Sequence, residues 1–115
     1  MDVKVIRDGH LLVRVNGEVD YSNSEELDSA LRCAVRDAPT GFVIDLTSVE
    51  YMDSAGVQSL LSAYKGLMKS GGRLAVVVTD SNVKGILDII NANRLPNFFI
   101  CGSVKAAELA LDGNT

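Results

Sequence analysis

Hydrophobic and polar positions follow two different periods along this 115-residue chain, and the order of these periods predicts its secondary structure. Two short runs rich in β-branched residues, 3–7 and 11–15, flank Asp8-Gly9-His10. An Asp-Gly pair between two such runs is a strong signal for a β-hairpin. We expect Gly17 to end the second strand of this hairpin.

A helical stripe follows the hairpin. Ser22 and Glu25 fit a capping box, in which the serine caps the helix and the glutamate reaches back to the cap. Behind them, apolar residues repeat at the spacing of one helix face: Leu27, Leu31, Ala34 and Val35. The helix is expected to end before Pro39.

The middle of the chain carries a nearly continuous apolar run over residues 42–46, which is typical of a strand covered on both faces. The clearest helical period of the sequence comes next, and its apolar positions are Val57, Leu60, Leu61, Tyr64, Leu67 and Met68. Gly71-Gly72 is expected to end this helix.

Strand and helix then alternate to the end of the chain. The pattern predicts a buried strand over residues 74–78, a third helix over 83–90 and a short strand over 98–101. A terminal helix, capped by Ser103, is expected to run to about residue 111.

This order predicts an α/β fold in a single domain spanning residues 1–115. Alternating helices and strands give parallel neighbours joined by right-handed crossovers, whereas the opening hairpin is antiparallel. The expected product is a small mixed β-sheet flanked by about four helices.

Composition and charge narrow the functional classes. The net charge of -4 and the pI near 4.8 argue against direct binding of nucleic acid, which needs a basic patch. No apolar run is long enough to cross a bilayer, and no signal peptide is visible, so we expect a cytoplasmic protein without membrane contact. Cys33 and Cys101 are expected to be small buried hydrophobes. Nothing in the pattern calls for a metal or a cofactor.

Candidate chemistry centres on Ser54, in the stretch Tyr51-Met52-Asp53-Ser54-Ala55-Gly56. A nucleophilic serine needs a base, and the single histidine, His10, lies in the predicted hairpin turn. The stretch also departs from the hydrolase motif G-x-S-x-G, because Met52 occupies the first glycine position. The sequence therefore disfavours an enzyme.

Two other interpretations of Ser54 stay open from the residues alone. In the first, Asp53 is a favoured N-cap residue, and Ser54 is simply the first residue of the helix that it caps. Alternatively, Ser54 is a phosphoacceptor, since a hydroxyl at the first turn of a helix is reachable by a kinase. A phosphate there would be held by open backbone N–H groups and the helix dipole.

Three blocks of the sequence together carry a family resemblance: GEVDYSNSEEL, FVIDLTSVEYMDSAGVQSLLSAY and GGRLAVVV. Their order and spacing resemble the STAS family, and within it the bacterial anti-sigma factor antagonists. The resemblance covers the chain from Val3 to about Leu111. It implies a small sheet flanked by helices, in agreement with the periodicity.

The resemblance also implies a function. In such antagonists the serine at the position of Ser54 is phosphorylated by the cognate anti-sigma factor, which is a serine kinase. The unphosphorylated antagonist binds the kinase, and the sigma factor is released. Phosphorylation ends this binding, and a serine phosphatase restores it by removing the phosphate. The resemblance implies a partner-binding surface made of Asp20, Tyr21, Ser22, Asn23, Met52, Asp53, Ser54, Ala55 and Gly56.

One departure from the family pattern falls at Ala55, where many relatives carry Ser or Thr, and it leaves Ser54 as the hydroxyl of the motif. For Tyr51 and Met52, contact with a partner and packing beneath the loop both stay open. The alternative function is a STAS subunit or adaptor of a transport or scaffold complex without phospho-switching.

Overall fold

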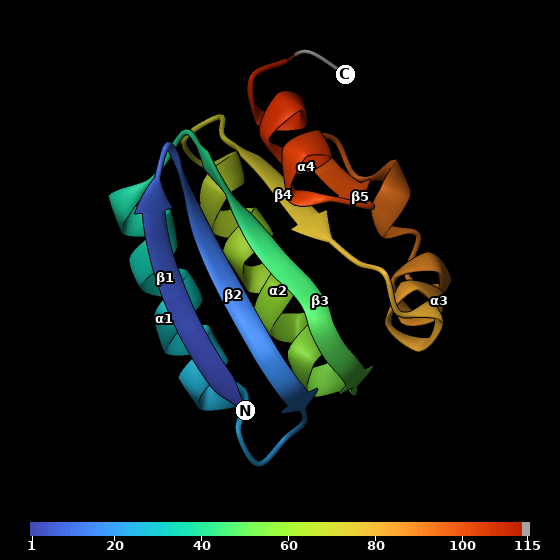
Figure 1. Cartoon of the computed structure of the whole chain (residues 1–115). Coiled ribbons are helices and arrows are strands. Elements are labelled where there is room, and N and C mark those ends of the chain that lie inside the picture. Colours follow the sequence, from blue (N-terminus) through green and yellow to red (C-terminus); the bar gives the residue numbers. More distant parts are fainter. Residues whose placement is uncertain (114–115) are drawn as a thin grey trace.

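The computed structural model describes residues 1–113, in which five strands form one mixed sheet in the order β1-β2-β3-β4-β5 (Figure 1). The strands are β1 (Asp2–Asp8), β2 (His10–Val19), β3 (Gly41–Met52), β4 (Arg73–Val77) and β5 (Phe98–Cys101). β1 and β2 pair antiparallel, and each later pair is parallel. The predicted mixed sheet with an opening hairpin is confirmed.

The helices divide between the two faces of the sheet. They are α1 (Ser24–Asp37), α2 (Ser54–Met68), α3 (Ser81–Ile89) and α4 (Val104–Leu111), with a short 3₁₀ helix, η1 (Ala92–Arg94), before β5. The larger core joins residues of α1, α2 and α3 to one face. The smaller core joins Ala107 of α4 to Val43, Ala75 and Val77 on the other face.

Both faces of β3 are therefore covered along its first half, which explains its continuous apolar run. Ile44 points into the larger core and Val43 into the smaller one, and both side chains are fully buried. Phe42, also buried completely, belongs to the larger core. A half-covered strand would have alternated apolar and polar residues instead.

Two strand boundaries differ from the sequence-based prediction. Gly17 does not end β2, which continues to Val19 with Gly17 at φ +94°. The parallel register between β2 and β3 shifts on either side of Asn16, so the glycine accommodates an irregularity within the strand. β3 likewise runs on to Met52, because it keeps pairing with β2 after its pairing with β4 has ended at Asp45.

Asp45, in the middle of β3, is a buried carboxylate held by hydrogen bonds within the fold. Its side chain is only about 4% exposed, and its carboxylate accepts hydrogen bonds from Arg14 Nε at 3.1 Å and the Thr47 backbone N–H at 3.0 Å. A buried carboxylate needs such partners, since burying an unpaired charge is costly. These bonds account for a polar residue inside an apolar strand.

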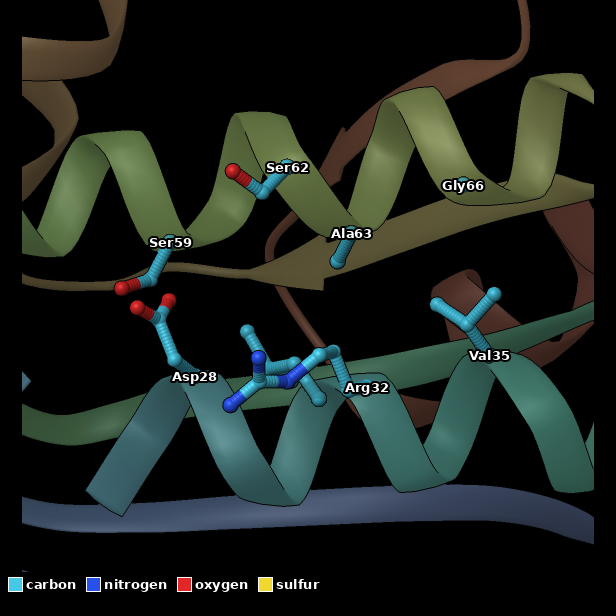
Figure 2. A pocket seen from close by; sticks show the side chains of 8 residues that line it. Asp28, Arg32, Val35, Ser59, Ser62, Ala63 and Gly66 are labelled. Atoms are coloured by element: carbon cyan, nitrogen blue, oxygen red, sulfur yellow. The ribbon is translucent and has the colours of Figure 1, made fainter. Parts of the chain in front are cut away.

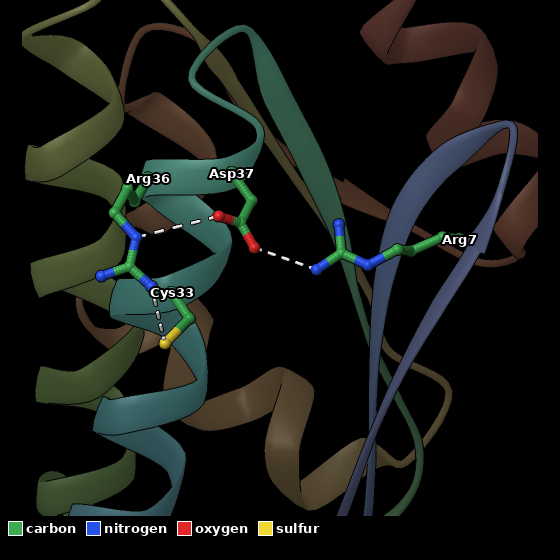
Figure 3. A network of polar contacts seen from close by, with 4 residues as sticks. All are labelled: Arg7, Cys33, Arg36 and Asp37. Carbon is green, nitrogen blue, oxygen red and sulfur yellow. Dashed lines mark hydrogen bonds and ion pairs between the residues drawn. The ribbon is translucent and has the colours of Figure 1, made fainter.

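The cysteines differ from the expectation that both are buried. Cys33 is exposed on α1, where the Arg36 guanidinium lies 3.5 Å from its sulfur (Figure 3). Cys101 is half-buried, and this burial raises the pKa of its thiol. Near Cys33, Asp37 pairs with Arg7 of β1 at 2.9 Å, a surface contact worth at most about 1 kcal/mol.

Candidate functional site

The start of α2 is fixed by Asp53, which is its N-cap as predicted. Asp53 has extended backbone geometry, and its Oδ1 accepts hydrogen bonds from the backbone N–H groups of Ala55 at 2.9 Å and Gly56 at 3.4 Å. These two donors would otherwise lack a partner at the first turn. Ser54 is thus the first helical residue, and it is exposed to solvent.

The loop between β2 and α1 is held by its own side chains. The Asp20 carboxylate accepts from both the backbone N–H (2.9 Å) and the hydroxyl of Ser22. Asn23 accepts from the Asp20 backbone N–H at 3.0 Å and donates to the Glu18 carbonyl at 2.9 Å. The loop is therefore a structured element with its polar groups engaged.

The predicted capping box is wrong. Asn23, not Ser22, occupies the N-cap position of α1, and its side chain makes no capping hydrogen bond. The physical reason is competition: the Ser22 hydroxyl is bonded to Asp20, and the Asn23 amide bridges Asp20 and Glu18 within the loop. Two acidic residues in the first turn, Glu25 and Glu26, still favour the helix through its dipole.

Asp53 brings the loop and the helix start together. Its Oδ2 accepts a hydrogen bond from the Tyr21 backbone N–H at 3.1 Å, and its own backbone N–H donates to the Val19 carbonyl at 3.1 Å. β2 and β3 are parallel neighbours, so their carboxyl ends lie at the same end of the sheet. In Figure 1 this end is opposite the β1–β2 turn.

Seven of the predicted surface residues are at least partly exposed, and two are buried. Tyr21 is 85% exposed, Ser22 and Ser54 are exposed, and the remaining partly exposed members are Asp20, Asn23, Asp53 and Ala55. We call these seven residues the Ser54 surface. The structure thus places most of the predicted partner-binding residues on one continuous patch.

Met52 and Gly56 are corrections to the predicted surface. Met52 is 1% exposed and belongs to the larger core, so its side chain is not available to a partner. Gly56 is buried, and a Cβ added there would lie 2.6 Å from Met52 Cγ and 2.8 Å from Val19 Cγ1. Both residues position the helix start from beneath instead of forming the surface.

Tyr51 is the aromatic residue that the sequence left open. It is 49% exposed, and it pairs with Glu18 in the extended part of the β2–β3 ladder. Successive residues of a strand point to opposite faces, so the burial of Met52 leaves Tyr51 on the outer side. Its exposure was hidden in the sequence because β3 was expected to stop at residue 46.

The electrostatics of the surface are acidic. Hydrogen bonds from Ser22, chiefly from its hydroxyl, lower the pKa of the Asp20 carboxyl below its ordinary value of 3.8. Asp20 is therefore a stable anion at neutral pH, and Asp53 carries a second carboxylate in the same patch. A phosphate added to Ser54 would therefore stand next to Asp53, in a patch that is already acidic.

His10 does not lie at this surface. It is the first residue of β2, at the opposite end of the sheet from the start of α2 (Figure 1). Its Nε2 contacts the Asp112 carboxylate at 2.7 Å, which ties the hairpin to the end of α4. Ser54 therefore has no histidine base within reach, which agrees with the sequence argument against nucleophilic catalysis.

A groove of about 300 Å³ lies between α1 and α2 (Figure 2). The carboxylate of Asp28 points across it toward the hydroxyl of Ser59, which itself donates to the Ala55 carbonyl at 3.2 Å. Arg32 and Ser62 add further polar groups to an otherwise apolar lining. The groove separates the helices and is not part of the Ser54 surface.

Within residues 1–113, no three His, Cys, Asp or Glu side chains are grouped as a metal ion would require. A bilayer-spanning helix would also need a longer apolar run than any helix of the described chain provides.

Known proteins support the fold and the family. Residues 3–107 match the family model of the STAS domain. An anti-sigma F factor antagonist from Paenibacillus polymyxa is 32% identical over 85 residues, which cover 70% of each chain. The chain belongs to the STAS domain family.

Solved structures agree with this assignment. A crystal structure of an anti-sigma factor antagonist from Mycobacterium paratuberculosis has a TM-score of 0.86 and 26% identity, covering 96% of this chain and 93% of that one. SpoIIAA in its unphosphorylated form has the same fold at 17% identity, with a TM-score of 0.72 and coverage of 97% and 96%.

Proposed function

We propose that this protein is an anti-sigma factor antagonist whose binding is switched by phosphorylation of Ser54. In its unphosphorylated form it binds an anti-sigma factor that is a serine kinase, and the sigma factor is released. The kinase phosphorylates Ser54 and ends the binding, and a serine phosphatase reverses the modification. The protein acts by binding and has no catalytic role of its own.

The observation that carries this proposal is the Asp53 bridge. It holds an exposed hydroxyl, that of Ser54, beside an ordered loop in which Tyr21 is 85% exposed. A rigid loop costs less entropy to bind than a mobile one. An exposed aromatic side chain of this kind is a common anchor in protein interfaces. The named antagonists among the relatives support the same assignment.

The geometry also explains why phosphorylation would end binding. The sequence predicted that open N–H groups at the helix start would hold the phosphate, but Asp53 already occupies those of Ala55 and Gly56. The phosphate would therefore stand at the surface next to Asp53, in the patch that also contains Asp20. A group carrying nearly two negative charges cannot be buried in an interface without matching cations.

The transfer itself needs nothing from this chain except the hydroxyl. The Ser54 oxygen forms a bond to the γ-phosphorus of ATP, the bond between that phosphorus and the β,γ-bridging oxygen breaks, and ADP leaves. The serine proton passes to a base of the kinase. Since the described structure offers no histidine near Ser54, the base is expected to come from the partner.

Binding measurements on defined variants test the proposal. The anti-sigma factor kinases of the source organism are purified, and each is titrated with the wild type, Ser54→Ala and Ser54→Asp. We expect one kinase to bind the wild type and Ser54→Ala alike, and to bind Ser54→Asp at least tenfold more weakly, about 1.4 kcal/mol.

Ser62→Asp is the matched control, since Ser62 is an exposed serine of the same helix outside the Ser54 surface. It adds the same charge and should bind like the wild type. Equal affinities of Ser54→Asp and the wild type for the kinase would overturn the switch. Failure of every such kinase to bind would instead favour a transport or scaffold role.

A further inference from the structure

The two edge strands of the sheet, β1 and β5, differ in how well their side chains prevent pairing with another strand. β1 carries exposed charged residues along one edge, including Asp2, Lys4 and Arg7. Charged side chains are a common means of keeping an edge strand from pairing. β5, at the other edge, reads Phe-Phe-Ile-Cys, and between residues 95 and 104 the single ionisable side chain is the Cys101 thiol.

Hydrogen bonds to β4 define which backbone groups of β5 face outward. The carbonyls of Asn97 and Cys101 accept hydrogen bonds from the N–H groups of Leu74 in β4 and of Val78 directly after it, each at 2.9 Å. Backbone groups alternate along a strand, so Phe98 and Ile100 direct theirs to the open edge. The Phe98 N–H is bonded within the chain, to the Leu95 carbonyl at 3.3 Å.

The outer edge is also sterically accessible. A hollow of about 620 Å³ runs along β5 and the neighbouring side of α4, and its lining includes Phe99 and Leu109, the latter 41% exposed. No atom lies within 4 Å of a Cβ added at Gly102, directly after the strand. An incoming strand would therefore meet apolar side chains and open backbone.

We propose that a second copy of this chain pairs antiparallel with β5, so that two sheets join into one of ten strands. Placing Ile100 opposite its counterpart lets the two residues exchange both of their N–H and C=O groups. The Phe98 carbonyl of each copy then accepts a hydrogen bond from the Gly102 N–H of the other. The Phe98 N–H, already bonded, lies outside this set.

The backbone pattern of this edge favours a second copy, and its lack of charge permits one. Each chain carries a net charge of -4, so most surfaces of two copies repel one another. The uncharged segment around β5 avoids this repulsion, and its pattern of donors and acceptors is complementary to itself about a two-fold axis. The interface is small, so we expect a dissociation constant between about 1 μM and 1 mM.

This dimer would leave the Ser54 surface free. Antiparallel pairing at β5 places the two Ser54 surfaces at opposite ends of the joined sheet. Self-association and the phospho-switch are therefore independent, and one can fail without the other.

Analytical ultracentrifugation of the full chain tests the proposal, with two glycine variants. Gly102→Glu places a charge at the paired edge, whereas Gly85→Glu adds the same charge on α3, where an added Cβ also has open space. We expect the wild type and Gly85→Glu to rise from 12.3 kDa toward twice that mass as the concentration approaches about 1 mM. Gly102→Glu should stay monomeric with an unchanged melting temperature.

Hydrogen exchange identifies the register in the same samples. The N–H groups of Ile100 and Gly102 should exchange more slowly as concentration rises, whereas that of Phe98 should not change. A wild type that stays monomeric at about 1 mM would overturn the proposal and leave the edge to another partner. A Gly102→Glu variant that dimerises like the wild type would overturn it as well.

Discussion

The carboxylate of Asp53 lies 3.1 Å from the backbone nitrogen of Tyr21 and accepts its hydrogen bond, while the other oxygen of the same carboxylate caps α2. One side chain thus sets both the position of Ser54 and the conformation of the loop beside it. A change at Asp53 should therefore affect stability and binding together, whereas a negative charge introduced at Ser54 should affect binding alone.

Replacing Asp53 with Ala should lower the free energy of unfolding by about 1 kcal/mol, the usual effect of removing an N-cap. Asp53→Asn should lose less, because its amide oxygen can still accept from the helix start. Ser54→Ala should change stability by less than about 0.5 kcal/mol, as is typical of an exposed side chain. Urea unfolding measures all three, and identical midpoints for Asp53→Ala and the wild type would contradict the cap's role.

Gly56 and Gly85 should respond in opposite directions to the same substitution. Gly56→Ala would force a Cβ within 3 Å of Met52 and Val19, and overpacking of this kind costs about 1–3 kcal/mol. Gly85→Ala has open space within α3 and should gain up to about 1 kcal/mol from helix propensity. A denaturant titration in which Gly56→Ala is the more stable of the two would show that the helix start is packed less tightly than described.

The Asp20 carboxyl should titrate below pH 3.8, because the Ser22 hydroxyl and nearby N–H groups stabilise its anion. A lowered pKa in the folded state means that this carboxylate stabilises the fold above its unfolded pKa. That contribution disappears as the pH falls through the lower, folded value. An NMR titration of the carboxyl carbon follows the change directly.

The Ser22→Ala variant isolates the cause. Its loss of the hydroxyl donor should raise the pKa of Asp20 toward 3.8, whereas Ser24→Ala should leave it unchanged, because the Ser24 hydroxyl donates to the Tyr21 carbonyl instead. If the titration of Asp20 is the same in both variants, the hydroxyl is not what lowers its pKa.

Local patterns predicted the elements of the fold well wherever their signals were strong. The strand Phe98–Cys101, the helix after Asp53 and the cap at Ser103 all lie where periodicity and capping chemistry placed them. These signals are local, so the sequence alone carries them. The prediction that Asp53 caps α2 is confirmed by the bonds it makes to Ala55 and Gly56.

The boundaries that failed depend on pairing between distant segments. The extension of β3 from residue 46 to Met52 requires β2 as a partner, and its polar residues Thr47 and Ser48 resemble a loop in isolation. Asn23 replaced Ser22 at the N-cap because the loop is held by contacts with Asp20 and Glu18. No helix-start motif encodes those contacts.

The sequence did not reveal which residues near Ser54 are buried and which are exposed. Sequence reasoning grouped Met52 with Ser54 because they are close in the chain, whereas the strand geometry buries Met52 and exposes Tyr51. The sequence could not predict that Asp53 would also accept a hydrogen bond from the Tyr21 backbone, since that contact spans 32 residues.

Phosphoryl incorporation tests the central claim most directly. The wild type, Ser54→Ala and Ser22→Ala are incubated with ATP and a lysate of the source organism whose kinases are shown to be active, and intact masses are recorded. We predict that the wild type and Ser22→Ala each gain one phosphoryl group and that Ser54→Ala gains none. Incorporation into Ser54→Ala equal to that of the wild type, or none into any of the three proteins, would contradict the account.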